Sequence, residues 1–212
     1  MENLPSYRYP VEELLKEFSE PTPPGAGGAA SLLGAIAASL VSKSARLTLG
    51  REGFDAVSEE MQRIVSRAAT LGSQCEELID QDPTAMNRLS ASAALPQGTP
   101  EEQEIRRTCI QTALKNAVQI PLVVAQHSLE VLSLAEAVVR YGAPRGAAEA
   151  MLAVRTAASA LDGSLLAAMS MLPTIEDEAF KQEQVEKARS LRDQGNAIEQ
   201  ELRKRAWDQL LV

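Results

Sequence analysis

The chain has 212 residues, a formal net charge of −8 and an aromatic content of only 3%. The excess of acidic residues argues against general nucleic-acid binding, and the scarcity of aromatic side chains argues against platforms on which bases could stack. Cys75 and Cys109 have no companion cluster of metal ligands, so free thiols in a reducing cytoplasm are expected. The first ten residues lack the basic-then-apolar order of a signal peptide.

Hydrophobic periodicity predicts helices along the chain, beginning with a short amphipathic helix over 11–18 and a loop rich in Pro and Gly. The segment from Pro21 to Arg51 begins with this loop and continues as an alanine-rich helix. The helix is apolar all round, as is typical of a helix in the centre of a bundle. One side of the helix is a strip of small residues, Ala30, Gly34, Ala38 and Ser42. The opposite side is expected to be buried because it carries larger apolar residues, Leu33, Ile36, Leu40, Val41 and Leu47. Gly50 offers a left-handed C-cap.

The same alanine-rich run is about long enough to span a membrane. Its many alanines and its serines make its transfer from water into a membrane only weakly favourable. Neither end has the Trp or Tyr that is common where a helix meets the membrane surface. A buried helix in a soluble protein is therefore the preferred interpretation.

A long amphipathic helix is expected from Phe54 to about Leu78. Pro83 is predicted to break or kink it before a second short helix near 84–93, because proline removes a backbone hydrogen bond.

The second half of the chain opens with Thr99 as an N-cap and Pro100 at the first helical position. Pro121 is expected to kink that helix midway. Two more helices are predicted, over 146–171 and from 175 to the C-terminus, the last an outer helix with Trp207 near its end. Without a linker between two cores, the sequence predicts one all-α domain, a bundle of long and partly kinked helices over 1–212.

Gly25, Gly27 and Gly28 lie just ahead of the central helix. No strand precedes them and no Lys followed by Ser or Thr comes after, so neither phosphate-loop motif is met. Glycines before a helix expose amides that can hold an anion or a polarised oxygen. A flexible turn into a tightly packed helix explains them about as well.

Two other positions could carry chemistry. His127, the only histidine, lies beside an apolar helix face and is expected to be structural. Asp80 and Asp82 precede Pro83, either as ordinary polar residues at a helix end or as a carboxylate held between buried helices for acid/base work.

The stretch PTPPGAGGAASLLGAIAASLVSKSARLTLG over 21–50 resembles the opening signature of the cyclodeaminase/cyclohydrolase family. The likeness continues through LIDQDPTAM over 78–86, ALP, EEQEIRR, IPL at 120–122 and EDEAF at 176–180, and so covers essentially the whole chain. The order and spacing of these segments are more telling than any single motif.

The resemblance implies an all-helical homodimer that acts on folate one-carbon derivatives without a metal or another cofactor. Such proteins hydrolyse 5,10-methenyltetrahydrofolate to 10-formyltetrahydrofolate, or cyclise 5-formiminotetrahydrofolate with loss of ammonia. Asp82 matches the family's aspartate and would be the principal acid/base, with Glu149 assisting. The loop with Gly25, Gly27 and Gly28 would receive the pterin or its one-carbon unit, and Arg46 and Arg51 would receive the folate carboxylates.

The chain departs from the family pattern at several of these places. The loop serine is missing, Arg46 replaces an asparagine, and the family's two late asparagines fall at Ala167 and Met171. Two hypotheses follow: a cyclohydrolase or cyclodeaminase, and a catalytically altered dimeric relative that binds a folate, another acidic metabolite or a partner protein. The lack of a formiminotransferase segment favours the hydrolase.

Overall fold

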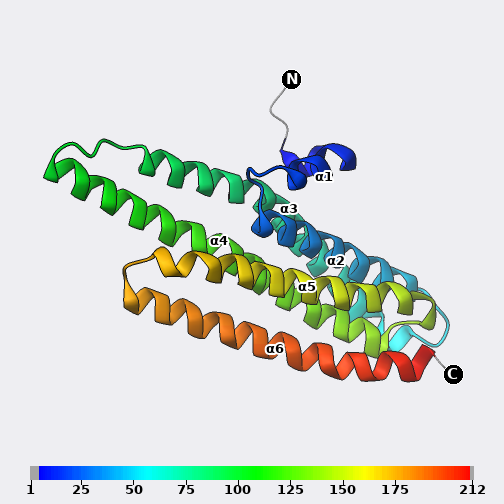
Figure 1. Cartoon of the computed structure of the whole chain (residues 1–212). Coiled ribbons are helices and arrows are strands. Elements are labelled where there is room, and N and C mark those ends of the chain that lie inside the picture. Colours follow the sequence, from blue (N-terminus) through cyan, green and yellow to red (C-terminus); the bar gives the residue numbers. More distant parts are fainter. Residues whose placement is uncertain (1–4, 211–212) are drawn as a thin grey trace.

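Long helices build the structure, a computed structural model that describes residues 5–210, with side chains as far as Arg203 (Figure 1). The α-helices are α1 (Val11–Ser19), α2 (Ala26–Thr48), α3 (Ser58–Ala93), α4 (Pro100–Tyr141), α5 (Ala147–Met171) and α6 (Glu178–Leu210). Four short 3-10 helices are η1 (Ser6–Arg8), η2 (Asp55–Val57), η3 (Pro144–Gly146) and η4 (Leu172–Thr174). The described residues contain no strand, so the all-α prediction is confirmed. The side chain of Trp207 lies outside the described part.

The helix α2 packs against α3, α4 and α5, and α6 covers the outer side of α4 and α5 (Figure 1). The strip of small residues on α2 is buried at Ala30 and Ala38. A Cβ added at Gly34 would lie 3.0 Å from the Cys75 sulfur of α3. Small side chains therefore allow α2 and α3 to approach closely, as the sequence predicts.

The opposite side of α2 is only partly covered. Val41 is fully buried, but Ile36 is 42% exposed, and Leu33, Leu40 and Leu47 are half-buried. The prediction that this side is buried is wrong for Ile36, because the other helices of the chain pack against the remaining sides of α2. An apolar face thus stays open at the middle of the helix.

The prediction of a break at Pro83 and of a separate helix after it is also wrong, because α3 runs through this residue as one helix of 36 residues; the alternative of a kink there remains a prediction. Proline has no N–H to donate to the carbonyl of Ile79. Ile79 and Ala85, on either side of it, are nevertheless buried in the bundle. Packing on both sides compensates for the lost hydrogen bond.

The helix α4 begins as predicted. The N–H of Glu102 donates to the Thr99 hydroxyl at 3.2 Å, and the Glu102 carboxylate accepts the N–H of Thr99, which completes a capping box. Pro121 lies inside this continuous helix of 42 residues and is buried; the kink there remains a prediction.

Two of the described helices, α2 and α4, are long and apolar enough to cross a membrane by length and composition. Half of the most apolar window of each is buried against other helices of the same chain. Core helices of soluble proteins share these properties.

Candidate active site

Asp82 lies on α3 and faces the loop that leads into α2. The backbone N–H of Gly25 donates a hydrogen bond to Asp82 Oδ2 at 3.1 Å. A Cβ at Gly27 would lie 2.6 Å from Asp82 Oδ1, closer than any real Cβ contact. A larger residue at position 27 would therefore displace the carboxylate, and two of the three predicted glycines lie at the predicted aspartate.

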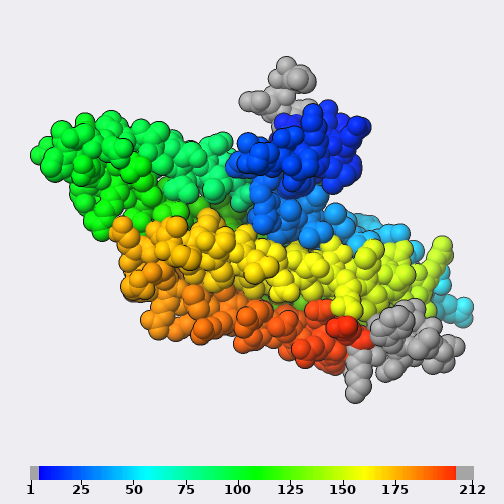
Figure 2. Space-filling view, in the orientation of Figure 1, coloured from blue at the N-terminus to red at the C-terminus, as the bar shows by residue number. Residues whose placement is uncertain are grey.

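These residues line a cavity of about 560 Å³ between the loop, α3 and the end of α5. In the space-filling view the dark-blue α1 and loop lie over the start of α2, beside the teal part of α3 (Figure 2). The cavity is lined by Phe18, Glu20, Pro21, Thr22, Pro23, Pro24, Gly25, Ala26, Gly27, Ala29, Asp82, Met86, Ala167, Ser170 and Met171.

The ionisable side chains that line this cavity are all acidic. Glu20 and Asp82 are its only ionisable residues, and no Lys, Arg or His lines it. The hydrogen bond from the Gly25 N–H orients the Asp82 carboxylate toward the loop. The cavity is therefore suited to a cationic group, next to a base that can take a proton from water.

The two aspartates before Pro83 have different environments. Asp80 Oδ1 accepts the backbone N–H of Ser6 at 2.9 Å and so ties the N-terminal segment to α3. Asp80 does not line the cavity. Of the pair, the structure brings only Asp82 to the glycine loop.

Gly28 has a packing role. A Cβ there would lie 2.7 Å from the Cβ of Pro24, and the residue is buried outside the cavity lining. The tight turn into α2 thus requires this glycine, which is the structural interpretation that the sequence left open.

Glu149 lies near the start of α5, whereas Ala167 of the cavity lies 18 residues further along the same helix, roughly 27 Å at 1.5 Å per residue. Its carboxylate pairs with the ammonium of Lys43 at 2.7 Å. The hydrogen bond from Lys43 lowers the pKa of Glu149. Within one chain the structure does not bring Glu149 to Asp82.

Arg46 and Arg51 also lie away from the cavity, at the C-terminal end of α2. Arg46 Nε donates to Ser42 Oγ at 3.4 Å, and Arg51 Nε donates to the carbonyl of Leu47 at 3.1 Å. The Arg51 contact satisfies a carbonyl at the helix C-terminus, and neither arginine lines the cavity with Asp82.

The two positions at which the family's late asparagines are missing do reach the cavity. Ala167 and Met171 line it, together with Ser170 between them. The sequence reasoning missed Ser170, Phe18 and Met86. Met86 could have been found from its spacing, since residues i and i+4 of a helix share a face and Asp82 is four residues earlier.

His127 lies outside the cavity and is half-buried on α4. Its Nδ1 is buried without a hydrogen-bond partner in the described part of the chain, and burial lowers the pKa of the imidazole. Burial likewise raises the pKa of the Cys75 thiol to about 12. The structural role expected for His127 stays a prediction.

Known proteins resemble this chain along nearly all of its length. A family model described as formiminotransferase-cyclodeaminase matches residues 10–190. A methenyltetrahydrofolate cyclohydrolase from Methylorubrum extorquens is 30% identical over 193 residues, which are 91% of this chain and 93% of that protein.

A formimidoyltransferase-cyclodeaminase from Rattus norvegicus is 28% identical over 160 residues, which are 75% of this chain but only 29% of the rat protein. The solved structure of a formiminotetrahydrofolate cyclodeaminase from Thermotoga maritima shares the fold, with a TM-score of 0.86 at 22% identity over 97% of this chain and 98% of that one. Taken with the family model, these likenesses show that the chain belongs to the formiminotransferase-cyclodeaminase family.

Proposed function

We propose that this protein is a methenyltetrahydrofolate cyclohydrolase of folate one-carbon metabolism. Its similarity to the Methylorubrum extorquens enzyme covers almost the full length of both chains. The observation that carries the proposal is the Asp82 carboxylate, held by the Gly25 N–H in a cavity whose lining has two carboxylates and no cation. The methenyl bridge of the substrate is a cation, which this cavity would favour.

Asp82 would act first as a base. It accepts a proton from water while the water oxygen bonds to the methenyl carbon, which gives a neutral carbinolamine. The protonated Asp82 then returns its proton to N5 as the bond between N5 and that carbon breaks. The hydroxyl proton leaves to solvent, and the carbon remains on N10 as a formyl group.

The other reaction of the family, cyclisation of a 5-formimino group with loss of ammonia, would use the same carboxylate. N10 would bond to the formimino carbon and lose its proton to Asp82, and protonated Asp82 would then donate that proton to the nitrogen that leaves as ammonia as its bond to the carbon breaks. The product would be the same methenyl cation. We favour hydrolysis because the similarity to the cyclohydrolase relative extends over 93% of that protein's length. A catalytically altered relative is not favoured, since Asp82, Gly25 and Gly27 form the expected constellation.

Both reactions are additions and eliminations with proton transfers, so we propose that the protein uses no metal and no cofactor besides its folate substrate. We further propose that it works in the cytoplasm, away from a membrane and from nucleic acid. The two cysteines are free thiols, which supports a reducing compartment such as the cytoplasm. The partial burial of α2 and α4, half of the most apolar window of each, within the bundle supports the soluble state.

We also propose that the protein is a homodimer that pairs through α2 and α5. Ile36 near the middle of α2 is 42% exposed and Leu152 of the neighbouring α5 is 56% exposed. An apolar patch centred on a helix suits a twofold axis, because the same patch then meets itself.

Such a pairing would run two copies of α2 antiparallel. The C-terminal half of α2 in the second copy, which carries Arg46, would then lie beside the first turns of α2 in the first. Glu149 and Lys43 of the second copy would approach the cavity of the first copy in the same way. This would reconcile the family's folate-binding positions with their separation from Asp82 in a single chain.

The reaction is tested by two assays on purified protein. In the first, loss of methenyltetrahydrofolate absorbance is compared with the buffer rate, at a pH where the spontaneous reaction is slow. In the second, ammonia release from 5-formiminotetrahydrofolate is measured. The proposal expects enzyme-dependent hydrolysis; ammonia release with hydrolysis at the buffer rate would assign the cyclodeaminase reaction instead.

A further inference from the structure

A groove of about 330 Å³ lies between α5 and α6 and does not include Asp82. The two helices lie side by side and antiparallel along one side of the bundle (Figure 1, Figure 2). The walls of the groove are Asp162, Leu165, Leu166 and Met169 of α5 and Val185, Ala188, Arg189 and Arg192 of α6. Spacings of three and four place each set on one face of its helix, so the two faces border the groove from opposite sides.

Most of this lining is aliphatic. Leu165 and Ala188 are buried, and Met169 and Val185 pack against the core cluster to which they belong. Leu166 is 71% exposed. The lining, all of it within the described part of the chain, contains no Ser, Thr, Asn or Gln. A polar group on the body of a ligand would therefore lose its hydrogen bonds to water without replacement, so the groove suits a hydrocarbon.

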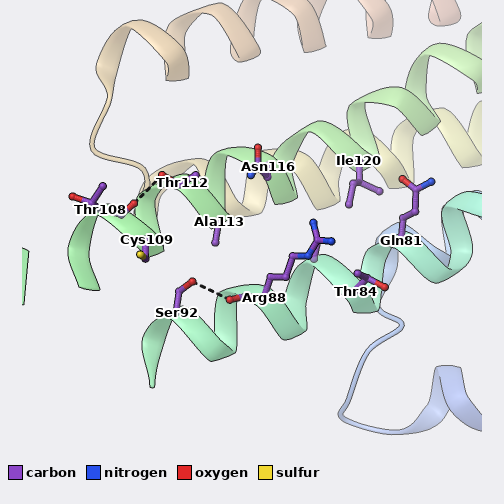
Figure 3. A pocket seen from close by; sticks show the side chains of 11 residues that line it. Gln81, Thr84, Arg88, Ser92, Thr108, Cys109, Thr112, Ala113, Asn116 and Ile120 are labelled. Carbon is purple, nitrogen blue, oxygen red and sulfur yellow. Dashed lines mark hydrogen bonds between the residues drawn. The ribbon is translucent and has the colours of Figure 1, made fainter. Parts of the chain in front are cut away.

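The cavity between α3 and α4, of about 640 Å³, has a different character (Figure 3). Hydroxyl and amide side chains line it, among them Thr84, Thr112 and Asn116 (Figure 3). A ligand body with polar groups finds hydrogen-bond partners there. The groove between α5 and α6 offers no such partners, so the two spaces suit different classes of ligand.

The groove has a charged end and an apolar end. Partial burial and the nearby Glu199 raise the pKa of Asp162, and Arg192 opposes this rise. Asp162 of α5 thus lies toward Arg192 of α6. Because the helices are antiparallel, Met169 and Val185 form the other end. Positions 162 and 169 are separated by about 10 Å along α5, at 1.5 Å per residue.

Arg189 is the cation that the groove leaves without a carboxylate. Arg192 offsets the charge of Asp162 and lies 3.6 Å from the carboxylate of Asp193. Arg189 forms no ion pair in the described part of the chain. It lies one turn from Val185 on the same face of α6. A carboxylate bound to Arg189 would therefore place an attached chain along the apolar end.

We propose that this groove is a binding site for a monocarboxylic acid with an aliphatic chain, such as a medium-chain fatty acid. The carboxylate pairs with Arg189, and the chain lies along Leu165, Met169 and Val185. Such a ligand has neither the rings nor the amide of a folate. The site is therefore separate from Asp82 and from the function proposed above.

The probe is decanoate, whose chain is about as long as the groove. Titration calorimetry measures its binding to the full chain, below the concentration at which decanoate forms micelles. We expect saturable binding that weakens about two- to fourfold for each methylene removed, measured with octanoate and hexanoate. Decylammonium has the same chain and the opposite charge, and we expect it to bind about fivefold more weakly.

Two variants test the two ends of the groove. Arg189→Gln removes the cation and should weaken decanoate binding about three- to fivefold, as expected for an exposed ion pair. Val185→Glu adds a carboxylate at the apolar end and should weaken it about tenfold or more. Arg203→Gln is the matched control, because Arg203 is exposed on the same helix outside the groove. Circular dichroism verifies that every variant keeps its helices.

Absence of saturable binding to the wild type, equal affinity in Arg189→Gln and the wild type, or equal affinity for decylammonium and decanoate overturns the proposal. So does binding to phosphatidylglycerol vesicles without binding of free decanoate, which would assign the groove to a membrane surface. Sedimentation velocity should give Val185→Glu the wild-type mass, and a lower mass would show instead that a second copy fills the groove. Since no measurement uses a folate, failure here leaves the proposed function untouched.

Discussion

At the scale of single residues, the central relation is between Asp82 and the glycines that face it. Gly25 contributes an N–H to one carboxylate oxygen, and Gly27 leaves room for the other. The neighbouring Asp80 has a structural partner in Ser6. One carboxylate of the pair therefore remains available to a substrate.

Gly27→Ala tests this relation. The new Cβ would lie 2.6 Å from Asp82 Oδ1, so the carboxylate must move, and a small displacement of a catalytic group can cost on the order of 10²-fold in rate. We expect kcat to fall by that order, measured with methenyltetrahydrofolate, while the circular dichroism spectrum stays unchanged.

Gly72→Ala is the matched control for that experiment. Its Cβ would lie 3.6 Å from the Cβ of Ala38, an ordinary contact in the middle of α3. We expect nearly wild-type activity in this variant. Equal kcat in Gly27→Ala and Gly72→Ala would show that the glycine is not required to position Asp82.

The sequence identified some of these residues and not others, for physical reasons. Asp82, Gly25 and Gly27 could be predicted because short motifs carried the family resemblance. Arg46, Arg51 and Glu149 were predicted from the same resemblance, but the length of α2 and α5 separates them from Asp82 in one chain. Spacing along the chain does not show which ends of two long helices meet.

At the scale of elements, α3 shows how packing overrides a local rule. Proline within a helix removes one hydrogen bond and opposes the helical conformation of the preceding residue. The sequence therefore predicted two helices where the structure has one. The buried Ile79 and Ala85 hold both sides of Pro83 in the same bundle, a tertiary effect that no local pattern contains.

Pro83→Ala should then stabilise the protein. The alanine N–H can donate to the carbonyl of Ile79, and alanine exceeds proline in helix propensity by about 3 kcal/mol. We expect the free energy of unfolding to rise by about 1 to 3 kcal/mol, measured by urea denaturation followed by circular dichroism.

Pro100→Ala provides the comparison, because Pro100 occupies the first position of α4, where no hydrogen bond is lost. We expect its free energy of unfolding to change by only a few tenths of a kcal/mol, about the difference that a well-tolerated proline makes. A destabilised Pro83→Ala would mean that α3 needs the proline.

At the scale of the whole molecule, the all-α bundle with α2 against three other helices could be predicted from composition and periodicity. The exposure of the face around Ile36 could not be predicted. A helix that is apolar all round has the same sequence pattern whether all of its sides pack against its own chain or one side packs against a second copy. This exposed side is the strongest support for the proposed homodimer.

Ile36→Glu tests the homodimer. A carboxylate at the centre of a twofold interface would face its own copy and replace a buried apolar contact of about 1.5 to 3 kcal/mol. We expect the mass in solution, measured by sedimentation velocity, to fall from two chains to one. Ile105→Glu changes an isoleucine that is 60% exposed on α4 and should leave the mass unchanged; a dimeric Ile36→Glu would place the interface elsewhere.

The most direct test of the central claim is the rate of methenyltetrahydrofolate hydrolysis by Asp82→Asn compared with the wild type. The variant keeps the shape and an acceptor for the Gly25 N–H but removes the base, and general bases contribute about 10²- to 10⁴-fold. The account predicts a fall of at least about 10²-fold in kcat with an unchanged melting temperature. Hydrolysis by Asp82→Asn at the wild-type rate would contradict it.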